Sequence, residues 1–164
     1  IGTVQLKGAG RPVEDSVRDI LALEEERHLD ALETMETFAR RVETLREQTM
    51  ALVSRWKQDG HTIAAFGAAR SGPTLIAQLG LQGSIDFIVD DHPEKVGKFS
   101  SGDGIPILPT SALAEKKPSY TLILAWVHSQ KIIETHQDYL HNGGHFVVLC
   151  PDTRVVGAQG TVDA

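Results

Sequence analysis

The chain has 164 residues, of which 41% are hydrophobic and 23% are charged, and its formal net charge is −6. This length gives room for one domain with an appendage, and the hydrophobic fraction excludes an intrinsically disordered chain. The negative charge provides no basic field for nucleic acid, and no apolar run approaches the roughly 18 residues of a membrane span. We therefore expect a cytoplasmic protein that has neither a nucleic-acid partner nor a membrane partner.

The chain opens without an initiator methionine, and residues 1–6 are typical of the end of a strand. We expect a fragment of a longer polypeptide, in which residues 1–14 are a linker or strand tail from a preceding domain.

Residues 15–60 are predicted to be a long helical segment. Residues 15–59 contain neither Gly nor Pro and are rich in Glu, Arg, Leu and Ala, a composition that favours helix. We expect a first helix over about Ser16–His28, an interruption near residues 29–32, and a second helix that ends at Asp59 and Gly60, because Gly60 suits the position just after a helix.

The second predicted helix carries an apolar stripe, because its apolar side chains recur at steps of three and four residues. The stripe consists of Met35, Phe38, Val42, Leu45, Thr49, Leu52 and Trp56. The spacing allows a coiled-coil homodimer, but three repeats with Thr49 in the seam favour a helix that packs on its own domain.

From His61 onward, short apolar runs alternate with helical patterns. Buried strands are predicted at 62–66, 85–89, 120–125 and 145–149, and helices at 73–79, 110–116 and 129–140. This order is typical of a Rossmann-like α/β domain with a doubly wound, mainly parallel sheet. We assign the domain to residues 61–152 and expect residues 153–164 to be a tail.

The loop after the first of these strands, residues 67–74, is a candidate phosphate site. The spacing from Gly67 to Thr74 is that of a P-loop, but Pro73 stands where the lysine should be, which disfavours triphosphate hydrolysis. Ser71 is expected to cap the helix that follows, and Gly72 to allow close approach of a ligand or a strand. Two interpretations remain open, a diphosphate-binding loop and an ordinary tight turn from strand to helix.

Other candidate residues follow later strands, and the carboxyl ends of parallel strands meet at one edge of a sheet. Asp90 follows the second strand and is interpreted either as a ribose-binding acid or as a turn residue ahead of Pro93. Lys95 and Lys98 supply charge to a phosphate or are simply solvated. Trp126 stacks on a base or packs in the core.

Three further motifs occur in order along the chain: Ile63-Ala64-Ala65-Phe66-Gly67-Ala68, Phe87-Ile88-Val89-Asp90-Asp91-His92-Pro93-Glu94-Lys95-Val96-Gly97-Lys98 and Gly104-Ile105-Pro106-Ile107. Together they resemble the C-terminal domain of the nucleotide-sugar C-methyltransferases over about residues 12–152. The resemblance implies a three-part polypeptide with a zinc-binding module, a central catalytic domain that binds S-adenosylmethionine, and this domain, which helps to hold the nucleotide-sugar. We therefore expect this chain to bind no cofactor itself and to be inactive alone.

The sequence departs from the family pattern at Glu14-Asp15, Arg70-Ser71-Gly72-Pro73 and Val127-His128, so the identity of the substrate stays open. Carried over by position, the expected substrate contacts are Gly67, Ala68, Arg70, Ser71, Gly72, Thr74, Asp90, Lys95, Lys98 and Trp126. The expected protein partner is the preceding methyltransferase domain. The alternative is a non-catalytic interaction or dimerisation module with a Rossmann-like core, and a nicotinamide-dependent oxidoreductase is disfavoured because the glycine fingerprint is broken.

Overall fold

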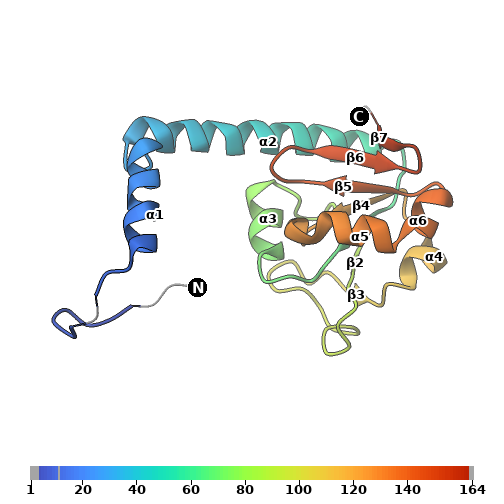
Figure 1. The fold of residues 1–164 in the computed structure, drawn as a ribbon. Helices are drawn as coiled ribbons and strands as arrows, with labels where there is room; N and C mark the ends of the chain where they lie inside the picture. Colours follow the sequence, from blue (N-terminus) through green and yellow to red (C-terminus); the bar gives the residue numbers. More distant parts are fainter. Residues whose placement is uncertain (1–3, 11, 163–164) are drawn as a thin grey trace. The chain divides into compact units, whose positions relative to one another are not determined.

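The computed structural model describes residues 4–10 and 12–162, and the chain divides into two compact units, Ile1–Arg41 and Val42–Ala164 (Figure 1). Helix α1 (Asp15–Glu26) lies in the first unit, and the division falls within helix α2 (Leu32–Gln58). The predicted pair of helices with a break between them is thereby confirmed. Residues 4–6, which the sequence predicted as the end of a strand, contain no strand, and residues 1–3 lie outside the described residues.

The first unit has no core of its own, because none of its described residues is buried. The apolar side chains of α1 are all substantially exposed, among them Ile20 at 54% and Leu21 at 58%. The first half of α2 is similar, since Phe38 is 65% exposed. Helix α1 has 12 residues, and an isolated helix of that length is only marginally stable in water.

The second half of α2 belongs to the larger unit and ends where the sequence predicts. Gly60 has a φ of +80°. Its N–H donates to the carbonyl of Lys57 at 3.1 Å, and the N–H of His61 donates to the carbonyl of Trp56 at 2.9 Å. These bonds occupy carbonyls that the end of a helix leaves without partners, so they turn the chain into the first strand.

Among the described residues, one sheet contains seven strands in the order β3-β2-β1-β4-β5-β6-β7. The first five strands in this order run parallel, whereas β6 and β7 pair antiparallel. Their bounds are β1 (Ile63–Phe66), β2 (Phe87–Val89), β3 (Ile107–Leu108), β4 (Tyr120–Ile123), β5 (His145–Val148), β6 (Arg154–Gly157) and β7 (Gly160–Val162). The predicted doubly wound, mainly parallel sheet is confirmed.

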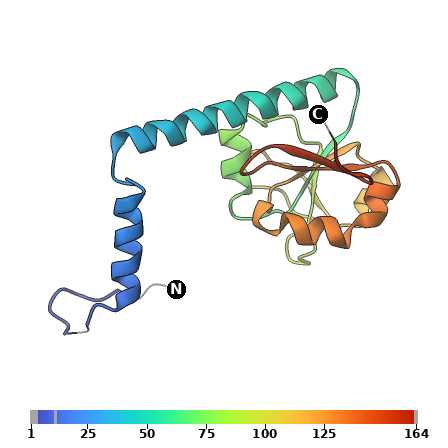
Figure 2. The same cartoon turned by 45° about the horizontal axis from the view of Figure 1, so that its top comes forward.

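Successive side chains of a strand point to opposite faces of the sheet. Because the side chains on both faces are buried, helices cover both faces. Ile63 and Ala65 of β1 pack in one hydrophobic core with Val53 and Trp56 of α2 and with helix α3 (Gly72–Gln78). Ala64 and Phe66 pack in a second core with helices α4 (Ala112–Lys116), α5 (Ser129–Thr135) and α6 (Gln137–His141). In Figure 2 the sheet lies between the second half of α2 and the α5–α6 pair.

Three parts of the prediction were wrong. Residues 153–164 were expected to be a tail, whereas β6 and β7 form a hairpin that extends the sheet by backbone hydrogen bonds. The two-residue strand β3 was not predicted. The single helix expected at 129–140 is divided into α5 and α6 at His136, and a short 3-10 helix, η1 (Trp126–His128), precedes it.

No helix within residues 4–10 and 12–162 combines the length and the apolar character needed to cross a membrane.

Candidate functional site

The loops that carry the predicted site residues meet at the carboxyl ends of the parallel strands. β1 lies between β2 and β4. The loop after β1 begins at Gly67, the loop after β2 begins at Asp90, and β4 leads into η1. In an open α/β sheet this reversal of strand order is where ligands bind.

Close packing fills the space directly between the ends of β1 and β4. A Cβ atom placed on Gly67 would lie 2.7 Å from the Cβ atom of Ala125. The N–H of Gly67 donates to the carbonyl of Val89 at 2.8 Å, so the start of the loop is also tied to β2. Ligand space at this edge therefore lies on the β2 side.

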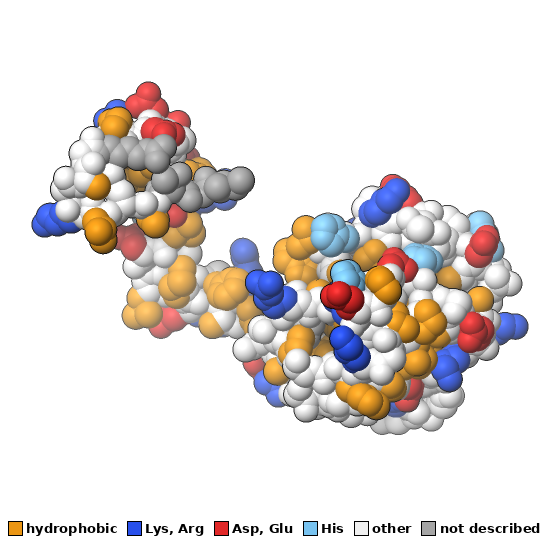
Figure 3. Space-filling view, turned by 90° about the horizontal axis from the view of Figure 1, so that it is seen from below, with side chains coloured by type: hydrophobic (Ala, Val, Ile, Leu, Met, Phe, Trp, Pro, Cys, Tyr) orange, Lys and Arg blue, Asp and Glu red, His pale blue; other side chains and the backbone are white. Residues whose placement is uncertain are grey.

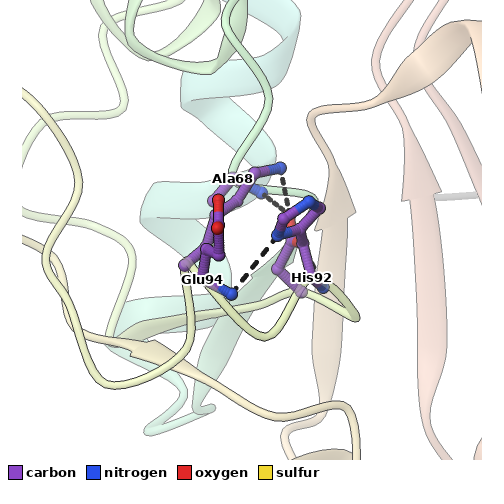
Figure 4. A network of polar contacts seen from close by, with 5 residues as sticks. Ala68, His92 and Glu94 are labelled. Atoms are coloured by element: carbon purple, nitrogen blue, oxygen red, sulfur yellow. Dashed lines mark hydrogen bonds and ion pairs between the residues drawn. The ribbon is translucent and has the colours of Figure 1, made fainter.

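Asp90 joins the loop after β1 to the loop after β2. Its Oδ2 atom accepts hydrogen bonds from the N–H of Ala68 at 2.8 Å and from the Lys95 ammonium at 3.0 Å, and its Oδ1 atom accepts from the N–H of His92 at 2.8 Å. His92 in turn accepts, at Nδ1, a hydrogen bond from the N–H of Glu94 at 3.3 Å (Figure 4). The second loop is thus folded around the carboxylate.

The carboxylate of Asp90 is held in its charged form. Burial raises the pKa of this group, but the hydrogen bonds from His92, Lys95 and Ala68, together with the positive charge of Lys95, outweigh burial and place the pKa below its ordinary value. Such a carboxylate stabilises the fold when ionised. Because its oxygens are already occupied by groups of the protein, Asp90 acts as a brace between two loops.

A pocket of about 450 Å³ lies between the start of α3 and the loop after β2. Its apolar lining comes from Ile76, Ile88, Ile107 and Leu124. Its polar and charged lining comes from Arg70, Lys95, Lys98, Glu94, Ser100 and Ser101. A volume of this size is in the range of small-molecule sites.

The charge of the pocket favours an anion. Three cations line it, and two carboxylates oppose them, Glu94 in the lining and Asp90 behind Lys95. Lys95 is engaged by Asp90, whereas no ion pair within the described residues involves Arg70 or Lys98. Both side chains are exposed, so the cationic groups available to a ligand are those of Arg70 and Lys98.

The backbone of the loop after β1 is only partly available to a ligand. The N–H of Ala68 is bound by Asp90, the N–H of Gly72 donates to the carbonyl of Ala69 at 3.0 Å, and Pro73 has none. For the N–H groups of Ala69, Arg70 and Ser71, no backbone carbonyl in the described part of the chain is an acceptor. The available amides therefore precede α3.

The expected cap at Ser71 is not formed in the predicted way. Ser71 occupies the position before α3, but its φ of −80° and ψ of −11° are helical, and its side chain makes no capping hydrogen bond. Gly72 is buried, and a Cβ atom placed on it would lie 3.5 Å from Cδ1 of Leu124, an ordinary contact. The space around Gly72 would therefore accept a Cβ atom, so packing of α3 on the end of β4 does not by itself require glycine here.

The structure brings only some of the predicted contact residues into one site. Five of the ten line the pocket: Ala68, Arg70, Gly72, Lys95 and Lys98. The other five do not: Gly67, Ser71, Thr74, Asp90 and Trp126. Trp126 is 38% exposed in η1, on the side of β1 that faces β4.

The lining residues that the sequence reasoning missed include Glu94, Phe99, Ser100 and Ser101, all from the loop after β2. For Phe99 the sequence did offer a sign of a functional role, because it is an aromatic residue in a loop rich in Gly and Ser, directly after Lys98. Such a residue is not needed by a strand or a helix, and the structure leaves Phe99 69% exposed.

The larger unit contains another pocket, of about 300 Å³, near the amino ends of β4 and β5. Its charged lining residues, Lys117 and Asp138, have opposite signs, and none of the predicted contact residues lies in it. In the part of the chain that the structure describes, no group of three or more His, Cys, Asp or Glu residues could hold a metal ion. The pocket beside α3 is therefore the candidate site.

Comparisons with known proteins agree in family and in extent. The sequence model of the C-methyltransferase C-terminal domain family matches residues 2–151. The C-methyltransferase NovU of Streptomyces niveus is 36% identical to this chain over 155 residues, which cover 94% of this chain and 37% of NovU. The chain thus spans little more than a third of the length of this curated relative.

Proposed function

Because the chain belongs to the C-methyltransferase C-terminal domain family, we propose that it is the nucleotide-sugar-binding part of a cytoplasmic methyltransferase. The methyl donor in this proposal is S-adenosylmethionine, held by a preceding domain of a parent polypeptide, and a zinc-binding module belongs to the same parent polypeptide. In this proposal the chain binds and positions the nucleotide-sugar that accepts the methyl group, and the chain alone does not transfer a methyl group.

The observation that carries the proposal is that two cations without an ion pair among the described residues, Arg70 and Lys98, line a partly apolar pocket at the ends of β1 and β2. Arg70 enters from the loop before α3 and Lys98 from the loop after β2. A guanidinium can bind a phosphate through two parallel hydrogen bonds, and an ammonium adds a mobile point charge. The apolar lining suits the less polar part of the same ligand.

The brace at Asp90 supports this role. Asp90 fixes the Ala68 end of one loop against the Lys95 region of the other, so both sides of the pocket are held before a ligand enters. A site organised in advance loses less conformational entropy on binding. Asp90 itself is proposed to position the loops and not to contact ribose.

The proposal is tested by calorimetric titration of the whole chain with thymidine diphosphate glucose, with thymidine as the control that lacks phosphate. We expect saturable binding of the sugar nucleotide that weakens as salt is added, because charge interactions at an exposed site are screened, and no measurable binding of thymidine at the same concentrations. The absence of saturable binding, or equal affinity for the two ligands, would overturn the assignment. Titration with S-adenosylmethionine should show no binding.

A second candidate function, an interaction or dimerisation module, is favoured by one observation. The first unit exposes a row of large apolar side chains on α1 and on the first half of α2, including Ile20, Leu21 and Phe38. Exposed apolar patches mark protein contacts, and the proposed partners are the preceding methyltransferase domain or a second copy of the chain.

Sedimentation velocity at several protein concentrations separates these two partners. A concentration-dependent dimer that is lost in Phe38→Glu supports self-association through the long helix. A monomer at every concentration assigns the surface to the preceding domain, and binding of that domain must then be weakened by the same substitution.

A further inference from the structure

Phe99 is an exposed aromatic residue at the candidate pocket. Its side chain is 69% exposed, yet it is among the residues that line the pocket. Burial of a Phe side chain stabilises a fold, and an exposed position gives up that stabilisation. Neither core of the larger unit includes it, so packing within the chain does not explain the residue.

The backbone around Phe99 is held in place. The N–H of Gly97 donates to the carbonyl of Ile107 at 2.9 Å, and the N–H of Ile107 donates to the carbonyl of Lys98 at 2.8 Å. On the other side, the N–H of Ser100 donates to the carbonyl of Ile105 at 2.8 Å, and the Ser100 hydroxyl accepts from the N–H of Ile105 at 3.0 Å. Phe99 also forms an antiparallel bridge with Pro106.

This hydrogen bonding has a consequence for binding. The backbone that presents the ring is ordered by β3 and by residues 105–107, so little backbone freedom remains to be lost when a ligand contacts the ring. An aromatic ring presented in this way provides a flat apolar surface. Such surfaces bind the faces of nucleobases, because every base has a π-face.

The neighbours of Phe99 define what kind of ligand the surface would meet. Lys98 is adjacent in sequence, and Arg70 lines the same pocket from the loop before α3. The face of the larger unit seen in Figure 3 shows hydrophobic side chains beside Lys, Arg and His side chains. A ligand that satisfies both kinds of group carries an anionic part and a planar part, as a nucleoside diphosphate does.

We propose that Phe99 is the base-stacking residue of this pocket, with Arg70 and Lys98 on the diphosphate. The inference rests on the proposed function and adds to it the side chain that recognises the nucleoside. Base stacking was one of the two interpretations of Trp126, which lies outside the pocket lining, and the proposal gives this role to Phe99. Because stacking is tolerant of base identity, Phe99 distinguishes a nucleotide from a simple phosphate more strongly than one base from another.

The test compares thymidine diphosphate with inorganic pyrophosphate, which has the same kind of charge but no base. Both are titrated calorimetrically into the whole chain and into the variants Phe99→Ala, Phe99→Trp and Arg70→Ala. Stacking on one aromatic ring is worth about 5- to 150-fold in affinity. We therefore expect Phe99→Ala to weaken thymidine diphosphate by about tenfold or more, to leave pyrophosphate within about twofold, and Phe99→Trp to retain nucleotide binding.

The outcomes separate this inference from the function on which it rests. If Arg70→Ala weakens both ligands while Phe99→Ala weakens neither, the phosphate site stands and the stacking role is wrong. If Phe99→Ala weakens both ligands equally, the residue supports the loop and does not read the base. If the unaltered chain binds neither ligand, both the proposed function and this inference are overturned.

Discussion

Gly67 and Ala125 pack so closely that the loops after β1 and β4 leave no room for a side chain between them. A Cβ atom on Gly67 would lie 2.7 Å from the Cβ atom of Ala125 and 3.3 Å from its backbone nitrogen. Gly67 also has a φ of +93°, a region that residues with side chains rarely adopt. Because this contact fills the space on the β4 side of β1, the pocket lies on the β2 side.

We expect Gly67→Ala to destabilise the fold through both effects, strain at positive φ and the clash with Ala125. Gly102→Ala is the matched control, because Gly102 has a φ of +88° with nothing within 4 Å of its added Cβ atom. Strain alone costs about 1–2 kcal/mol, and overpacking adds about 1–3 kcal/mol. Urea unfolding measures both variants, and equal losses would show that the close approach is of no consequence.

Asp90→Asn should lower the free energy of unfolding at neutral pH, because the buried brace loses its charge and keeps only part of its acceptors. The expected loss is about 1.5–3 kcal/mol, the range for hydrogen bonds to a charged group. Since the pKa of Asp90 is below its ordinary value of 3.8 in the fold, the ionised group stabilises the protein above that value and loses this effect as the pH falls through the folded pKa.

The measurement is the stability difference between the unaltered chain and Asp90→Asn from neutral to acid pH. The difference should be constant at neutral pH and shrink below about pH 4. Asp91→Asn serves as a control, because Asp91 is the neighbouring carboxylate and is exposed. A stability difference that persists unchanged into acid would contradict the brace.

The sequence was informative where a strand is a short, continuous apolar run. Strands β1, β2, β4 and β5 are short runs buried on both faces, and such runs are recognisable without knowledge of the fold. The three strands that were missed lack a fully buried run: β3 has two residues, β6 has the burial pattern of a strand that is only partly covered, and all three residues of β7 are exposed. Strands of this kind are specified by backbone pairing with a neighbour.

For the candidate site too, the sequence predicted the location in the sheet but not the contacts between distant loops. The sequence placed the loops of Gly67, Asp90 and Trp126 at one edge of the sheet, because strand direction fixes that edge. It could not show that Gly67 closes the β4 side or that Asp90 is occupied by Ala68 and Lys95. These relations depend on distances between loops that are far apart in the chain.

Arg70→Ala should weaken binding of thymidine diphosphate glucose by about 1.5–3 kcal/mol, the range for a charge-assisted hydrogen bond. Lys131→Ala is the control, because Lys131 is exposed on α5 and does not line the pocket. Gly72→Val should also weaken binding, since its branched side chain would press on Leu124 and shift α3. Equal affinity of Arg70→Ala and Lys131→Ala would exclude Arg70 from the phosphate site.

Tyr139→Phe should destabilise the second core by about 1–3 kcal/mol, because buried groups are left without a partner. The Tyr139 hydroxyl accepts a hydrogen bond from the Thr121 hydroxyl at 2.9 Å and donates to the carbonyl of Pro118 at 2.9 Å. Adding Thr121→Val should restore part of the loss, since the unpaired hydroxyl is then removed. A double variant that is as unstable as the sum of the single variants would contradict the pairing.

Because Tyr139 is buried, we also expect the free energy of unfolding to fall at alkaline pH. Burial raises the pKa of Tyr139 to about 12 from an ordinary value of 10.0, although its hydrogen bonds with Thr121 and with the backbone of His145 act in the opposite direction. Between these two values the unfolded chain loses the proton while the folded chain keeps it, so stability falls as the pH rises. The stability difference between the unaltered chain and Tyr139→Phe should therefore shrink above about pH 10.

The second half of α2 should be indispensable to the larger unit, whereas residues 1–41 should not be. Trp56 is 3% exposed and stacks on Tyr120 with ring centroids 3.8 Å apart, and Val53 is 3% exposed. The Thr49 hydroxyl lies 3.0 Å from that of Thr153, a hydrogen bond to the segment before β6. By contrast, no described residue before Val42 is buried.

Two truncated chains separate these contributions. A chain of residues 42–164 should melt cooperatively near the temperature of the full chain, because it keeps both hydrophobic cores. A chain of residues 61–164 loses Val53 and Trp56, each worth about 1.5–3 kcal/mol, together with the polar tie at Thr49. The combined loss is comparable to the whole stability of a small domain, so this chain should show no cooperative transition. A sharp transition at the same temperature would show that α2 only leads into the fold and does not complete its core.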